Sequence, residues 1–161
     1  MIRKATVADL PEVMRIYEAA KKFMCENGNP TQWPGNYPDE DLVLEDITDG
    51  NLYVICTENG TVAACFGLFI GDDPTYSYIE GAWASDTPYA AIHRVASDGS
   101  VRGVFRMAFE FVSARHSHIR IDTHEDNITM QKAIEKCGFV YRGTIYVENG
   151  TPRRAYEWIR E

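Results

Sequence analysis

Apolar side chains recur at helical spacing in the first part of the chain. Between Val7 and Met24 they repeat every three or four residues, and Pro11 stands in the first turn, where its missing N–H costs nothing. Three further helices are predicted at Pro38–Ile47, Gly103–Arg115 and Asn127–Lys136, and Gly138 is expected to end the last of them. The pattern therefore predicts four helices.

Strands are predicted between these helices, at Ile2–Lys4 and in two hairpins. The tetrapeptide Glu-Asn-Gly-Thr occurs at 58–61 and at 148–151, each time between alternating runs. Asn-Gly is a strong hairpin signal, because both residues tolerate the positive φ of a type I′ turn. The predicted hairpins pair Leu52–Thr57 with Thr61–Ile70, and Val140–Val147 with Thr151–Ile159.

Two single strands, Tyr89–Ala96 and Ile119–Thr123, complete the predicted order: strand, helix, helix, hairpin, strand, helix, strand, helix, hairpin. This order is typical of an α/β sheet of mixed direction, with at least one right-handed parallel crossover through Gly103–Arg115. Nothing resembling a linker divides the 161 residues. We expect one domain, residues 1–161.

Composition narrows the function classes. Apolar residues make up 45% and charged residues 25%, which is ordinary for a globular protein. Sixteen Lys and Arg against 24 Asp and Glu give a net charge of −8, which argues against nucleic acid as the main partner. A solvated acidic surface explains this charge, and a cationic substrate would also fit it.

The segment Met1–Thr6 lacks the apolar core of a signal peptide, and apolar runs such as Val62–Ile70 are too short to cross a membrane. We expect a cytoplasmic protein without a membrane partner. The four cysteines and four histidines show no metal-ligand spacing, so no metal and reduced thiols are expected. A cross-strand pair of Cys56 and Cys65 is the alternative.

The stretch Ser97–Phe105, SDGSVRGVF, carries the first candidate chemistry. It follows a strand and leads into a helix, so the N–H groups of about Val101–Arg106 would face an anion, with the helix dipole adding attraction. Neither the G-x-x-x-x-G-K-[ST] motif nor G-x-G-x-x-G after a strand occurs, so the usual signatures for nucleoside triphosphates and dinucleotides are absent.

This region resembles the GNAT superfamily of acetyl-CoA-dependent N-acetyltransferases. In that family a strand ending in Val leads into a pyrophosphate loop, [Q/R]-x-x-G-x-[G/A]. Here Val95 precedes Ser100-Val101-Arg102-Gly103-Val104-Phe105, so the central glycine matches and both outer positions depart. Downstream, IRIDTHEDNITMQKAIEKCGFVYRG resembles the family's strand, Asn, helix and Gly-Phe, with Asn127 at the cofactor-contacting Asn.

The resemblance implies a fold and a cofactor site. The fold would be a single GNAT-like domain with a mixed, mostly antiparallel sheet, a splayed parallel strand pair and about four flanking helices. Acetyl-CoA would be the co-substrate, with its pantetheine arm paired along the strand edge at His93–Ala96. The cofactor-binding residues it implies are Arg94, Val95, Ala96, Val101, Arg102, Gly103, Val104, Phe105, Arg106 and Asn127.

Phe105 is the main departure from the family's loop. Backbone N–H groups hold the diphosphate in the family, and any residue except proline supplies one. Phe105 is expected to turn inward beside Phe109 and Val112, because an apolar residue on an amphipathic helix is usually in the core.

The candidate catalytic residues match the family less well than the cofactor-binding residues do. The family's usual acid is a Tyr four residues before the Gly of Gly-Phe, and that position here is Ile134. Tyr141 and Tyr146 are alternative acids. The structural alternative is that each is a strand residue whose ring packs against its neighbours. His93 is a candidate base because its pKa suits neutral pH, with Glu80 as the second candidate. A structural hydrogen-bonding role for His93 and a solvated surface position for Glu80 remain open.

Substrate-binding residues are predicted in the variable loops. Trp33, Tyr37 and Trp83 are placed near the acceptor mouth, with packing in the core or at a dimer interface as the alternative. His124 is placed near the cofactor cleft. Its alternative is a polar loop in which Asp126 caps the next helix.

We therefore expect an N-acetyltransferase that moves an acetyl group from acetyl-CoA to a primary amine of a small molecule, peptide or protein, by direct attack in a ternary complex. A homodimer is expected from the resemblance. Two alternatives stay open: a non-catalytic acyl-CoA-binding or regulatory domain of the same fold, and an interaction module in which Gly99 and Gly103 only shape a corner.

Overall fold

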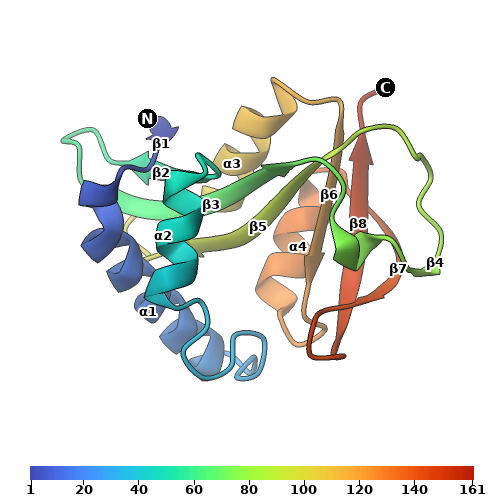
Figure 1. Cartoon of the computed structure of the whole chain (residues 1–161), viewed down its shortest axis with the longest axis horizontal. Coiled ribbons are helices and arrows are strands. Elements are labelled where there is room, and N and C mark those ends of the chain that lie inside the picture. The colour runs from blue at the N-terminus through green and yellow to red at the C-terminus, as the bar shows by residue number, and fades with distance from the viewer.

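The computed structural model describes residues 1–161 as one eight-stranded sheet flanked by four α-helices (Figure 1). The strand order is β1-β2-β3-β5-β6-β8-β7-β4. The strands are β1 (Ile2–Lys4), β2 (Leu52–Cys56), β3 (Val62–Ile70), β4 (Glu80–Gly81), β5 (Ala90–Ser97), β6 (His118–Thr123), β7 (Val140–Tyr146) and β8 (Pro152–Ile159). The helices are α1 (Leu10–Glu26), α2 (Glu40–Thr48), α3 (Val104–Ser113) and α4 (Ile128–Lys136). The predicted fold class is confirmed.

The pair β5–β6 is the one parallel pair in an otherwise antiparallel sheet, and α3 forms the crossover between the two strands. Only two residue pairs join them, Ala90 with Ile119 and Ala91 with Arg120. Figure 1 shows the strands meeting near the top of the view and running apart below it. The sheet therefore opens between β5 and β6 beyond Ala91.

Apolar side chains cover both faces of the sheet. Helices α3 and α4 pack with one face, which includes Phe66, Ile92 and Ile121, whereas α1 and α2 pack on the other. Phe105 belongs to the apolar cluster on the face covered by α3 and α4. Its side chain is 5% exposed, and the centre of its ring lies 6.0 Å from the centre of the Phe139 ring. The predicted inward rotation of Phe105 is confirmed.

Both hairpins form at the predicted places, but their turns differ from the prediction. A type I′ turn needs a positive φ at both Asn and Gly, whereas only Gly60 (φ 86°) and Gly150 (φ 83°) have one. Each loop spans five residues and is closed by the glycine N–H, which in the first hairpin donates to the Thr57 carbonyl at 3.0 Å. Across this hairpin Cys56 faces Val62, so it is not a partner of Cys65.

Other elements differ by a few residues. A 3₁₀ turn, Val7–Asp9, precedes α1, and Pro11 lies in the first turn of that helix as predicted. The alternative in which Asp126 caps α4 is wrong: Asn127 is the N-cap, and its side-chain oxygen accepts the Met130 N–H at 3.1 Å. Neither the 3₁₀ turn Pro74–Tyr76 nor the two-residue strand β4 was predicted.

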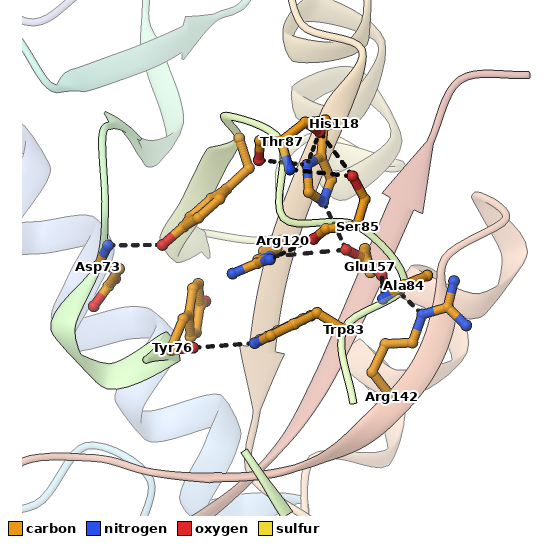
Figure 2. A network of polar contacts seen from close by, with 11 residues as sticks. Asp73, Tyr76, Trp83, Ala84, Ser85, Thr87, His118, Arg120, Arg142 and Glu157 are labelled. Atoms are coloured by element: carbon orange, nitrogen blue, oxygen red, sulfur yellow. Dashed lines mark hydrogen bonds and ion pairs between the residues drawn. The ribbon is translucent and has the colours of Figure 1, made fainter. Parts of the chain in front are cut away.

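A buried polar network holds the segment between β4 and β5 against the sheet (Figure 2). Glu157 on β8 is fully buried, and its carboxylate accepts the Ala84 N–H at 2.8 Å, Arg142 Nε at 2.9 Å and His118 Nε2 at 2.6 Å. Burial opposes the charge, but these donors outweigh it and hold the pKa of Glu157 below its usual value. This network fixes the start of β5, the strand that carries the site.

No helix of the structure is both long enough and apolar enough to span a bilayer.

Candidate active site

A bulge in β5 marks the centre of the site. The pairing with β3 shifts between Cys65, opposite Ala96, and Gly67, opposite His93. Arg94 has φ 50° and is the one non-glycine residue with a positive φ. Such a conformation is strained for a residue with a side chain, and strain of this kind concentrates at functional sites. The bulge lies where β5 leaves β6.

Two cavities meet at this bulge. One, of about 510 Å³, lies between α1, β5, α3 and α4 and is called here the cofactor cavity. The other, of about 830 Å³, lies between α2, the loop before it, β5, β6 and β8, and is called the acceptor cavity. Their linings share Met24, Val95, Asn127 and Met130. Groups bound in the two cavities would therefore meet beside Val95.

The cofactor cavity ends at a row of unused backbone donors. The N–H groups from Val101 to Arg106 have no acceptor in the protein, and Gly103 has the positive φ (72°) that turns the chain into α3. Successive free N–H groups at a helix start bind anions, and the helix dipole favours negative charge there. These donors fit a diphosphate.

Most of the predicted cofactor-binding residues line this cavity. They are Val95, Ala96, Gly103, Val104, Phe105, Arg106 and Asn127, while Val101 and Arg102 lie outside the lining. Arg106 and Lys136 supply two cations to it. Asp98 is the one carboxylate in the lining, and it pairs with Arg15 at 3.1 Å.

Arg94 departs from its predicted cofactor role, because it lines the acceptor cavity instead. Its Nη2 pairs with Asp46 on α2 at 2.5 Å, and its Nη1 donates to the Tyr37 hydroxyl at 3.1 Å. Burial raises the pKa of Asp46, and Arg94 opposes that effect. Arg94 therefore ties the bulge to α2 and to the loop before it.

His93 also faces the acceptor cavity, and two carboxylates flank its ring. Nε2 lies 2.8 Å from Asp73 Oδ2, and Nδ1 lies 4.0 Å from Asp122 Oδ2. Asp122 accepts the Tyr76 hydroxyl proton at 2.7 Å. Burial opposes ionisation of Asp73, but His93 and Thr75 outweigh it and lower the pKa of Asp73 to about 2. The Asp73 carboxylate therefore accepts a proton from Nε2, which leaves Nδ1 as the acceptor nitrogen.

Of the four predicted substrate-binding residues, two line the acceptor cavity and two do not. Trp33 and Tyr37 line the acceptor cavity, with ring centres 6.4 Å apart. Trp83 lies outside it: its Nε1 donates to the Tyr76 carbonyl at 3.0 Å (Figure 2), and its ring packs against Arg120. His124 lies outside both cavities and contacts the Thr31 hydroxyl at 3.3 Å.

Glu80 and Tyr141 do not join His93. Glu80 lies on the edge strand β4 and is bonded to the Tyr146 hydroxyl, whereas Tyr141 packs on Tyr156. Neither lines either cavity. The structural alternatives fit both residues better than catalysis does.

Sequence reasoning missed Asp73 and Asp122. Asp73 stands in a loop 20 residues before its partner, so nothing local links it to His93. Asp122 carried a usable signal, because it is a carboxylate within a predicted strand, IRIDT, whose two isoleucines indicate burial. A carboxylate in such a strand needs a partner or a function.

Comparisons with known proteins bear on the fold that carries this site. No protein-family model and no curated protein matches the sequence. Among solved structures, a GNAT-family acetyltransferase from Streptococcus agalactiae is 29% identical, with TM-score 0.91, and the match covers 100% of this chain and 95% of that one. A GNAT-family acetyltransferase from Listeria monocytogenes (19% identity, TM-score 0.70) is matched over 99% of this chain and 94% of its own. Both neighbours confirm the predicted fold, and the Streptococcus agalactiae structure also supports the resemblance predicted from the sequence.

Proposed function

We propose that this chain, a GNAT-superfamily acetyltransferase, uses acetyl-CoA as the acetyl donor and a primary amine as the acceptor, which react directly in a ternary complex. The observation that carries the proposal is the meeting of the two cavities at the β5 bulge. One cavity ends at free N–H donors that suit a diphosphate, and the other contains a histidine held by a carboxylate.

The cofactor cavity holds the donor in this proposal. The N–H groups from Val101 to Arg106 bind the diphosphate, and the free edge of β5 at Val95 and Ala96 pairs with the pantetheine amides. Acetyl-CoA supplies an activated acetyl group as its thioester. The Val95 N–H, at the junction of the cavities, is proposed as the donor that stabilises the oxyanion.

His93 is the proposed general base. Asp73 accepts its Nε2 proton, so Nδ1 takes the proton that the amine nitrogen loses as it attacks. Asp122 lies beside Nδ1 and attracts the amine into position. Ile134, at the family's usual acid position, is fully buried and cannot donate a proton. The leaving thiol has an ordinary pKa of about 8.5, so water suffices to protonate the thiolate.

Binding and catalysis are tested separately. Acetyl-CoA at about 100 times its Kd should raise the free energy of unfolding by roughly 2.7 kcal/mol, with ADP as the control ligand. His93→Gln should keep this stabilisation but lower kcat for amine acetylation, followed as thiol release, by roughly 10²- to 10⁴-fold. It should also remove the corresponding ionisation from the pH–rate profile.

His116→Gln is the matched control, because His116 lies outside both cavities. Stabilisation by acetyl-CoA without turnover on any amine would favour a non-catalytic acyl-CoA-binding domain. The absence of stabilisation at millimolar acetyl-CoA would refute the proposed donor site.

A further inference from the structure

We propose that the acceptor is an amino acid, meaning a small amine that also carries a carboxylate, and that Arg153 binds this carboxylate. The inference rests on the proposed function and names the substrate class of the same acceptor cavity. It comes from a buried charge that the mechanism above leaves unused.

Arg153 is a buried arginine without an acidic partner. It lies on β8, is 6% exposed and lines the acceptor cavity. Its guanidinium donates only to neutral oxygens: Nη1 to Thr151 Oγ1 at 3.1 Å and to the Pro152 carbonyl at 2.9 Å, and Nη2 to the Gln32 carbonyl at 3.1 Å. Burial lowers its pKa, and the charges of Asp122 and Tyr37 oppose this effect only in part.

Two other arginines with little exposure, the half-buried Arg94 and the buried Arg120, each have a carboxylate partner. Arg94 has Asp46 at 2.5 Å and Arg120 has Glu157 at 3.8 Å, whereas no carboxylate lies within 4.0 Å of Arg153. Removing a cation from water without a counter-ion is costly, and a ligand carboxylate would offset that cost. The planar fork of arginine is suited to carboxylates in particular.

Asp122 provides a negative charge in the same acceptor cavity, beside His93. In the β6–β8 register Asp122 faces Ala155, and Arg153 is two residues before Ala155, so both charged residues lie on one face of the sheet. Such diagonal neighbours are about 7–8 Å apart between their Cα atoms. Asp122 forms no ion pair with an arginine or lysine within 4.0 Å and lies 4.0 Å from His93 Nδ1, although its charge acts on Arg153 over a longer distance.

An amino acid matches this pair of charges. Its amine would lie between Asp122 and His93, where the proposed base acts, and its carboxylate would reach Arg153. The remaining carboxylates of the cavity, Glu45, Asp49, Asp72 and Glu148, are exposed and therefore screened by water. They would favour a diamine, which the experiment includes as a competing substrate.

The first experiment compares substrates that differ only in the carboxylate. The twenty standard amino acids, each paired with its amide, and 1,4-diaminobutane are assayed for acetylation with acetyl-CoA. At least one amino acid should exceed its amide in kcat/KM by roughly 10- to 100-fold. Preference for the amides or for the diamine would overturn the inference while leaving acetyl transfer to amines intact. No turnover on any amine would instead count against the proposed function.

The second experiment changes the arginine. Arg153→Gln should lower kcat/KM for the preferred amino acid by roughly 10- to 100-fold and leave its amide within about twofold, whereas Arg153→Lys should retain part of the preference. Arg154→Gln is the control, because Arg154 stacks on Tyr141 outside both cavities.

If Arg153→Gln lowered kcat/KM equally for the amino acid and its amide, Arg153 would only support the loop that contains Gln32. That result would overturn the inference. The amino acid should also raise the melting temperature of the wild-type protein more than that of Arg153→Gln. This binding readout does not depend on turnover.

Discussion

Asp73 shows how one carboxylate links the site to the stability of the fold. Its pKa is about 2 in the folded protein against an ordinary 3.8, so its charge stabilises the fold above pH 4 by about 2 kcal/mol. This contribution is lost as the pH falls from about 4 through 2, and about 1 kcal/mol of it is gone by pH 3. Only 20% of its side chain is exposed, so solvent screens the charge little.

Asp73→Asn should therefore be less sensitive to acid than the wild-type protein. In urea unfolding at pH 5, 4 and 3, the wild-type advantage in free energy of unfolding should shrink by about 1 kcal/mol between pH 5 and pH 3. An advantage that stays constant over this range would mean that the pKa of Asp73 is not depressed.

At this scale the sequence reveals residue types more readily than their partners. His93 was predicted because imidazole suits a base near neutral pH, and the structure places it in the acceptor cavity. Its partners come from a loop and from another strand, and only the closed sheet brings them together. Arg94 was placed on the cofactor side because the bulge, which turns its side chain toward α2, has no local sequence signal.

Helix α3 combines two tasks: its first residues offer N–H groups and its apolar side packs on the sheet. Phe105→Ala should lower the free energy of unfolding by roughly 3–5 kcal/mol, because it removes a buried ring that contacts Phe139. Stabilisation by acetyl-CoA should persist, since alanine supplies the same N–H.

Urea unfolding with and without acetyl-CoA tests both statements, and Glu110→Ala, on the exposed side of α3, should stay within about 0.5 kcal/mol. A Phe105→Ala protein of unchanged stability would contradict the inward packing.

The elements that could be predicted are those with a repeating pattern. The four helices and both hairpins follow from apolar spacing and from Asn-Gly, and they lie within a few residues of the prediction. Strand β4 has two residues and no pattern, so it could not be found. It forms because Gly81 and Gly143 let two backbones approach: a Cβ on Gly143 would lie 2.1 Å from the Glu80 carbonyl oxygen.

At the scale of the whole molecule, Glu157 joins β6, β7, β8 and the segment before β5 (Figure 2). Glu157→Gln should lower the free energy of unfolding by roughly 3–5 kcal/mol, because His118 and Arg142 would lose a buried anionic partner. Urea unfolding at pH 7 measures this, with Glu58→Gln in an exposed turn as the control. A loss below 1 kcal/mol would mean that the neutral amide satisfies the same donors.

The opening between β5 and β6 has a consequence for how the protein avoids unwanted association. Beyond Ala91, the side of β5 that faces β6 has no strand paired with it, which makes it a sheet edge in the middle of the sheet. Exposed edges invite pairing with other chains and lead to aggregation. Here α1 and α4 line the space beside this edge, so the unpaired backbone lies inside a cavity and not along an outer edge of the sheet. The unpaired stretch of β5 is therefore available to a ligand in the cavity and is covered by helices against pairing with another chain.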